Sequence, residues 1–146
     1  MQEERTFRMC RGRVVSKKEL VKRIEDEFKK VGVMIKHKFL NHNTTWEERL
    51  FRMCGDHVFI DVYFQDRPFG ASIIRHTNSY GGTTGLFEVA VLKYSPGLDA
   101  FRIASDSSFP ENVMGHLNLE DVIELLWDIY DEDDPYGYAG RAIMGR

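Results

Sequence analysis

Two polar side chains near the middle of the chain have the types and the spacing that acid–base chemistry uses. His57 and Asp61 are four residues apart, and in an extended strand that spacing places both on one face. Arg52 would lie near them if the segment before Gly55 folds back as a hairpin partner. An imidazole, a carboxylate and a cation serve general acid–base or phosphoester chemistry. Because polar pairs are also common on the solvated face of a sheet, His57, Asp61 and Arg52 are the catalytic candidates of a secondary hypothesis only.

A glycine-rich segment over residues 78–85 (NSYGGTTG) invites comparison with a phosphate-binding loop. It lacks the Lys-Ser/Thr pair of such loops, and it does not open a helix, where backbone amides and the helix dipole would favour an anion. The segment therefore predicts a flexible connection between strands, a kind of loop that often carries binding residues. Arg75, His76 and Tyr80 lie beside it and are candidates to contact an anion or a base.

The net charge of −3 conceals a strong asymmetry along the chain. Residues 1–40 carry twelve Lys and Arg against six Asp and Glu, whereas residues 106–146 carry two against ten. Such an imbalance is typical of an interaction surface, although solvated helix faces produce it as well. The acidic candidates for binding a partner, by mimicry of a phosphate backbone, are Glu120, Glu124, Asp128, Asp131, Asp133 and Asp134. The run 131–134 lacks the glycine and the distal glutamate of a calcium loop, so no metal site is predicted.

The basic residues are concentrated between positions 11 and 38, which makes nucleic-acid binding a second alternative. Glutamates and aspartates alternate with the lysines in the middle of this region, and they weaken its positive field. No RNA-recognition, KH or zinc-finger signature is present. Nucleic-acid binding through residues 11–38 therefore ranks below protein binding.

One octapeptide occurs twice with a single difference: residues 3–10 read EERTFRMC and residues 47–54 read EERLFRMC. Two interpretations remain open. A partial duplication would leave residues 1–15 as an inert N-terminal extension. Alternatively, the first copy is an edge strand that can occupy the same position in the sheet as the second, within one chain or in a homodimer.

The elements that position these residues follow from hydrophobic periodicity. Ser16 and Glu19 form a capping box before a helical apolar stripe that ends at Gly32. Alternating segments predict strands over 33–39, 45–54, 57–65, 71–76, 86–94 and 100–104. We expect the strands over 45–54 and 57–65 to pair as a hairpin. A second amphipathic helix begins at Asn118 and ends before Pro135, and residues 135–146 read as a flexible tail.

These elements predict an α+β fold in a single domain over residues 1–146. An antiparallel sheet of about five to six strands, built as a meander of hairpins, would carry both amphipathic helices on one face. No apolar run is long enough to span a bilayer and no secretory leader is evident. Cys10 and Cys54 lack metal-binding spacing, so we expect free thiols, a cytoplasmic protein and no cofactor.

The chemistry-bearing residues, taken together, favour a non-catalytic interaction or regulatory protein that binds another macromolecule, most directly a protein. Aromatic residues beside mobile segments, Trp46 and Tyr80 among them, and the acidic end support this interpretation. Small chaperones and virus-encoded inhibitors of host machinery share the same size and acidity, which is an analogy only. The first alternative is a small hydrolase or nucleotide-handling enzyme that uses His57, Asp61 and the 75–85 loop. A homodimer through residues 3–10 or a sheet edge is a further prediction.

Overall fold

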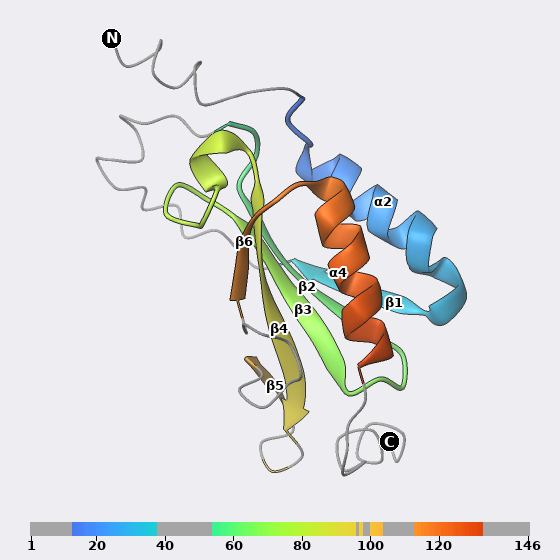
Figure 1. Ribbon diagram of the computed structural model, residues 1–146. Coiled ribbons are helices and arrows are strands. Elements are labelled where there is room, and N and C mark those ends of the chain that lie inside the picture. Colours follow the sequence, from blue (N-terminus) through green and yellow to red (C-terminus); the bar gives the residue numbers. More distant parts are fainter. Residues whose placement is uncertain (1–12, 38–53, 96, 98–99, 104–112, 133–146) are drawn as a thin grey trace, which may run out of the picture.

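The computed structural model describes residues 13–37, 54–95, 97, 100–103 and 113–132 (Figure 1). Several features that the sequence singled out lie outside these ranges: Trp46, Arg52, Asp133, Asp134, the repeat copies over 3–10 and 47–53, and the tail over 135–146. In chain order the described elements are α2 (Lys17–Phe28), η1 (Lys29–Val31), β1 (Val33–His37), β2 (Val58–Phe64), β3 (Phe69–Arg75), η2 (Gly82–Thr84), β4 (Phe87–Ser95), β5 (Ala100–Ile103), β6 (Val113–Leu117) and α4 (Leu119–Asp131). The predicted α+β class, with two helices and a sheet of five to six antiparallel strands, is confirmed.

The two helices begin at the capping residues that the sequence indicated. The Ser16 hydroxyl accepts a hydrogen bond from the backbone amide of Glu19, at 3.0 Å. Asn118 and Asp121 form a complete capping box, in which each side chain accepts from the other residue's amide. Gly32 ends the first helical segment at a φ of +70°, a backbone conformation that glycine adopts without steric cost.

The strands form one six-stranded antiparallel sheet in the order β1-β2-β3-β4-β5. Strand β4 is long enough for two neighbours on the same edge, because β5 pairs with Leu92–Ser95 and β6 pairs with Phe87–Ala90. The register of β2 places Lys36 of β1 opposite Asp61 and places Ser72 of β3 on its other side. This register decides which side chains share each face of the sheet.

The predicted pairing of 57–65 with 45–54 is wrong along most of β2. A strand has two edges, and those of β2 are occupied by β1 over Ile60–Phe64 and by β3 over Val58–Tyr63. The turn signal at Gly55-Asp56 is local, whereas the choice of a neighbouring strand depends on the whole sheet. Residues 45–53, the expected partner strand, lie outside the described part of the chain.

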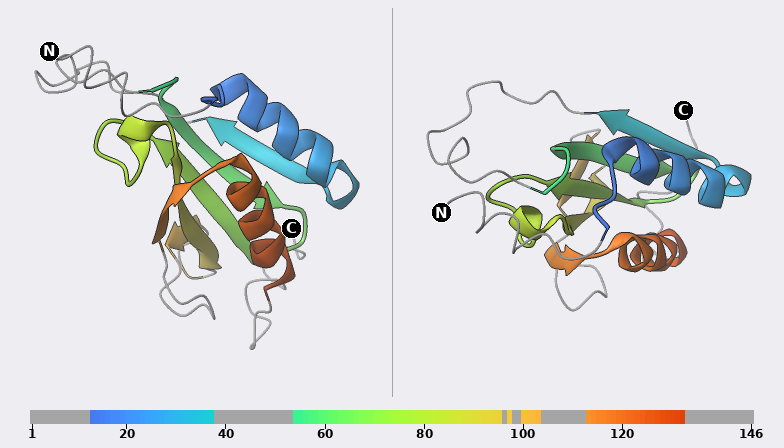
Figure 2. Two further views of the ribbon diagram at one scale, coloured as in Figure 1. Left: turned by 45° about the horizontal axis from the view of Figure 1, so that its top comes forward. Right: turned by 90° about the horizontal axis from the view of Figure 1, so that it is seen from above.

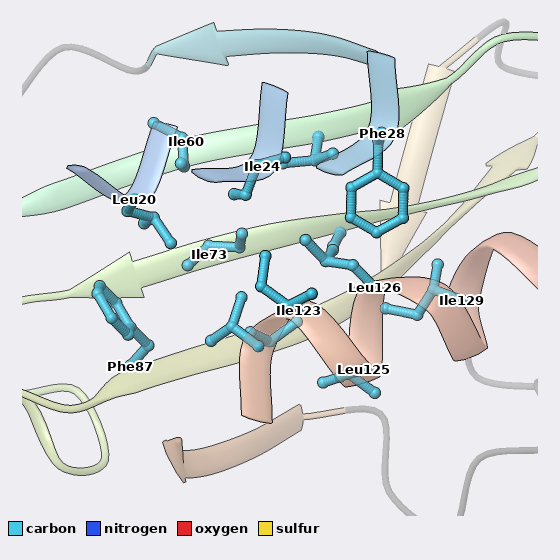
Figure 3. Close-up of a cluster of buried hydrophobic side chains, with 14 of the residues drawn as sticks. Leu20, Ile24, Phe28, Ile60, Ile73, Phe87, Ile123, Leu125, Leu126 and Ile129 are labelled. Carbon is cyan, nitrogen blue, oxygen red and sulfur yellow. The ribbon is translucent and has the colours of Figure 1, made fainter. Parts of the chain in front are cut away.

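The core lies between the sheet and both helices, as predicted. Leu20, Ile24 and Phe28 of α2 are fully buried against one face of the sheet, and Val122, Leu126 and Ile129 of α4 are buried beside them. Figure 3 shows Leu20, Ile24, Phe28, Leu126 and Ile129 gathered with Ile60, Ile73 and Phe87 in one cluster. Each such burial contributes roughly 1.5–3 kcal/mol to folding.

Direct contacts also join α2 to α4, which lie on the same side of the sheet (Figure 2). The Phe28 and Trp127 rings are 4.3 Å apart between centroids. The Trp127 indole N–H donates to the Glu27 carboxylate at 2.9 Å, and Arg23 bridges Glu27 and Glu120. These contacts hold the two helices as one layer.

Two local features differ from the sequence-based expectations. Strand β6 was not predicted, because a register irregularity between Phe87 and Val89 and a positive φ of 57° at His116 interrupt its alternation. Cys54 is 3% exposed and its sulfur is in a disulfide, so the expectation of free thiols is wrong for this residue. In the described part of the chain, no helix is long and apolar enough to cross a membrane.

Candidate functional site

The face of the sheet opposite the helices is the surface with the most binding potential. In β2 the residues Val58, Ile60, Val62 and Phe64 are buried, whereas those between them point the other way and are partly exposed. We call this second surface the open face, since no described helix packs on it. Its side chains, assigned by strand register, are Met34, Lys36, Phe59, Asp61, Tyr63, Ser72, Ile74, Glu88, Ala90, Leu92, Tyr94, Phe101 and Ile103.

Aromatic rings gather at one end of the open face. The centroids of Tyr63 and Phe101 are 4.5 Å apart, and those of Tyr94 and Phe101 are 5.4 Å apart. They line a groove of about 800 Å³, whose other lining residues are Gly32, Val33, Met34, Lys36, Phe64, Gln65, Asp66, Arg67 and Ala100. Met34 and Ile103, on β1 and β5 of the open face, expose 57% and 58% of their surface.

The Tyr63 phenol is the central polar group of this groove. Its hydroxyl donates to the Asp61 carboxylate at 3.2 Å, and the Lys36 ammonium lies 5.5 Å from the ring centroid. Partial burial, together with the negative charge of Asp61 and the hydrogen bond to it, raises the pKa of Tyr63 to about 12. The phenol therefore stays protonated and donates a hydrogen bond at neutral pH.

His57 and Asp61, the residues of the secondary acid–base hypothesis, do not contact each other. Four residues of strand separate their backbones by about 13 Å, and the Asp61 carboxylate bonds to Tyr63. Phe59 lies between His57 and Asp61 on the same face of the strand, and its ring stacks on His76 with centroids 5.2 Å apart. These two candidates therefore lie on one face, as expected, without forming an acid–base pair.

Arg75 is a structural residue, which corrects its selection as a candidate for ligand binding. The side chain is fully buried and donates to the backbone carbonyls of Val15, Asp56 and Gly85. Its guanidinium lies 4.8 Å from the centroid of the Phe87 ring. Burial lowers the pKa of this guanidinium, and the nearby Asp56 carboxylate partly opposes that shift. No outside anion reaches a side chain with no exposed surface.

The glycine-rich loop joins β3 to β4 as predicted, and its amides are already used. Gly82 packs so closely that an added Cβ would lie 1.8 Å from the His76 carbonyl oxygen. Tyr80 is 64% exposed at the tip, but its amide donates to Glu88. Further amides that donate within the protein are those of His76, Asn78, Ser79, Gly82, Thr84, Gly85 and Leu86. Few amides are left to cradle a phosphate.

The acidic residues of α4 form an exposed stripe. Glu120, Glu124, Asp128 and Asp131 are all exposed, and α4 contains no lysine or arginine. Arg23 of α2 pairs with Glu120 at 3.3 Å. Successive members are about 4.5–6 Å apart along the helix axis. In the described residues, no three His, Cys, Asp or Glu side chains gather closely enough to hold a metal ion.

The site residues that the sequence analysis missed are Met34, Lys36, Tyr63, Tyr94, Phe101 and Ile103. Each follows the alternation of its own strand, but only the strand order brings them side by side. Comparison with known proteins adds no assignment. No family model, curated protein or solved structure matches this chain. Its function is therefore argued from the geometry of the open face, the groove and the acidic stripe.

Proposed function

We propose that this chain is a non-catalytic binding protein that contacts another macromolecule, most directly a protein, through the open face of its sheet. The observation that carries the proposal is the one-sided packing of the sheet. Helices α2 and α4 cover one face, and the opposite face combines aromatic rings with a few polar groups around a groove. Aromatic residues surrounded by a polar rim are the usual composition of a protein-binding surface.

The chemistry of the groove favours binding over catalysis. Tyr63 is held protonated, Lys36 lies over its ring, and Arg67 is committed to the carbonyls of Tyr130 and Glu132. The hydroxyl–carboxylate contact in the groove, from Tyr63 to Asp61, keeps the phenol protonated, so it does not supply the activated nucleophile that nucleophilic catalysis requires. The groove supplies a cluster of aromatic rings, a hydroxyl donor and a cation, which suit recognition of a polypeptide.

The test is a comparison of binding by three forms of the chain in extracts of its native cells. The double substitution Phe101→Ser with Ile103→Glu places polar groups on the open face, and Lys30→Glu is the control at an exposed position outside it. We expect wild type and the Lys30 variant to capture the same partner and the double variant to lose it, with thermal unfolding confirming that all three are folded. Capture of the same partner by all three forms would remove the open face from the proposal.

The enzymatic alternative is tested separately. Replacing His57 and Asp61 with alanine would abolish the activity of an enzyme built on them. In a binding protein with the proposed surface, the two substitutions remove the hydrogen bond from Tyr63 to Asp61 and leave the aromatic rings of the groove in place. We expect partner capture by this double variant to remain.

The acidic stripe on α4 supports a second candidate function, in which the helix occupies a basic groove of its partner. The helix carries five carboxylates without a basic residue, and four of them, from Glu120 to Asp131, recur at intervals of three or four residues on its exposed side. Glu124→Lys with Asp128→Lys reverses the middle of the stripe without touching the Arg23–Glu120 pair. If this variant loses the partner while the Phe101/Ile103 double variant still binds it, α4 and not the open face is the binding surface.

Nucleic-acid binding through the basic N-terminal region receives less support. Several of its cations are paired within α2, because Lys22 contacts Asp26 at 3.1 Å and Arg23 contacts Glu27 at 2.6 Å. Binding of this kind would weaken steeply with added salt. Flat salt dependence of any observed nucleic-acid affinity would dispose of it.

A further inference from the structure

The outer edge of β1 has backbone groups that no described strand uses. The Gln65 amide donates to the Gly32 carbonyl at 2.9 Å, which makes these two residues a hydrogen-bonded pair between antiparallel strands. Hydrogen-bonded and non-hydrogen-bonded pairs alternate along an antiparallel ladder. The backbone amides and carbonyls of Met34 and Lys36 therefore also point towards β2. The amides and carbonyls of Val33, Ile35 and His37 consequently point away from the sheet. Figure 2 shows β1 beside α2 at this margin of the molecule.

Hollows flank this edge on both faces of the sheet. On the helix side, two hollows of about 460 and 550 Å³ lie between α2 and β1, and both are lined by Val21, Glu25 and His37. On the opposite side, Met34 and Lys36 line the aromatic groove. A strand added to β1 would send alternate side chains to the two faces. The edge thus offers both backbone pairing and side-chain hollows, the two components of strand-addition recognition.

The charge around this edge is positive. Residues 28–37 contain three lysines, Lys29, Lys30 and Lys36, and no acidic residue. Lys17 and Lys18 line one of the hollows on the helix side, and the acidic residues there are Glu25 and Asp26, of which Asp26 is paired with Lys22. An added strand that carries carboxylates would be attracted, whereas a basic one would be repelled.

We propose that β1 binds an extended, acidic segment of a partner protein, which adds to the sheet as a further strand. The proposal rests on the function proposed above and specifies the partner. The bound segment would alternate carboxylate and apolar side chains, and its backbone would pair with that of Val33, Ile35 and His37. A second copy of this chain is a poorer occupant. Antiparallel pairing of β1 with itself would place the lysines and histidines of both copies together, and a charged edge usually prevents such pairing.

The probes are short capped peptides that alternate valine with a charged residue. One carries glutamate and a second carries lysine. A third is the glutamate peptide with its backbone N-methylated on the edge that would pair. Binding is followed by amide chemical shifts and by hydrogen exchange of Val33, Ile35 and His37. We expect the glutamate peptide to bind at least about tenfold more tightly than either other peptide and to slow exchange of these three amides.

Two matched pairs of variants localise the interaction. Ile35→Pro removes an outward amide and keeps the hydrogen bonds of β1 to β2, and Ile35→Val keeps the amide. Lys36→Glu reverses a charge on the edge, and Arg102→Glu reverses the charge of an exposed residue on β5, at the other end of the strand order. We expect the first member of each pair to lose about tenfold or more in affinity and the second to bind like wild type. Thermal unfolding confirms that each variant is folded.

Each contrary result overturns the proposal in a recognisable way. If the glutamate peptide fails to bind, or if the lysine peptide binds equally well, β1 does not recognise an acidic strand. Binding that survives Ile35→Pro but is lost in the Phe101/Ile103 double variant keeps the open face and removes the edge. A concentration-dependent dimer that Ile35→Pro dissociates, measured by sedimentation, would assign the edge to a second copy instead.

Discussion

The covered face and the open face of this sheet are built from alternate residues of the same strands, yet they have very different surroundings. In β2, Ile60 and Val62 are fully buried under the helices, while Phe59 and Asp61 between them are only partly buried. Apolar burial is the dominant favourable term in folding. The comparison therefore teaches that stability resides mainly on the helix side, which leaves the open face able to carry binding groups without loss of the fold.

The sharpest test of this difference is one phenylalanine from each face. Phe28→Ala removes a fully buried ring that contacts Phe64 and Trp127, and we expect it to lower the free energy of unfolding by about 3–5 kcal/mol. Phe101→Ala on the open face removes a partly exposed ring and should cost about 1 kcal/mol. Urea unfolding of both variants measures this. Equal losses would contradict the assignment of stability to the covered face.

Two arginines extend the comparison to polar groups. Arg75→Met leaves the buried carbonyls of Val15, Asp56 and Gly85 without their donor, and we expect a loss of about 3 kcal/mol. Arg67→Met removes a partly buried arginine from two carbonyls that water reaches more easily, at a cost of about 1 kcal/mol. The same unfolding measurement applies. A smaller loss for Arg75 than for Arg67 would show that the guanidinium is not a structural link.

The contact between the helices should give a pH-dependent contribution to stability. The Trp127 hydrogen bond and Arg23 hold the pKa of Glu27 below its usual value of 4.5. The stabilisation is therefore fully present above pH 4.5 and is lost as the pH falls through the lowered pKa. We expect Trp127→Phe to lower the free energy of unfolding at neutral pH and to flatten the acid side of the stability curve. If the stability of the Trp127 variant falls with acid as steeply as that of wild type, the proposed contribution of the Trp127–Glu27 hydrogen bond is wrong.

The smallest expected effect on stability belongs to the open face. Tyr63→Phe removes one partly exposed hydrogen bond, so the loss at neutral pH should stay below about 0.5 kcal/mol. Phenolate absorbance of the wild type should show one tyrosine that titrates near pH 12, and the variant should lack it. Because folding raises this pKa from 10.0, wild-type stability should be constant below pH 10 and fall as the pH rises towards 12. A wild-type protein without a late-titrating phenol would contradict the hydrogen bond to Asp61.

Local sequence signals predicted the elements whose information is contained within a few residues. Ser16 and Asn118 marked the helix starts, and the alternation of Val58 to Phe64 marked both the strand and its buried face. Strand β6 escaped prediction because Gly115 and the positive φ of His116 break the period on which a strand is recognised. Irregular backbone of this kind leaves no simple pattern in the sequence.

The candidate site was less accessible to prediction, for a physical reason. The neighbours of a strand are set by the energy of the whole sheet, so nothing near β2 indicated that β1 would pair with it. The groove of Tyr63, Phe101 and Met34 depends on that order. Arg75 ends an apolar strand, and its sequence position alone gave no sign that three carbonyls and the Phe87 ring would enclose it.

The central claim is that one face of this sheet is covered and the other is accessible to a partner, and isoleucine methyl groups test it directly. Ile60 and Ile73 lie on the covered face, while Ile74 and Ile103 lie on the open face. We predict that a soluble paramagnetic agent will broaden the methyl resonance of Ile103 strongly and that of Ile74 measurably, and will leave Ile60 and Ile73 sharp. Equal protection of all four methyl groups would contradict the account.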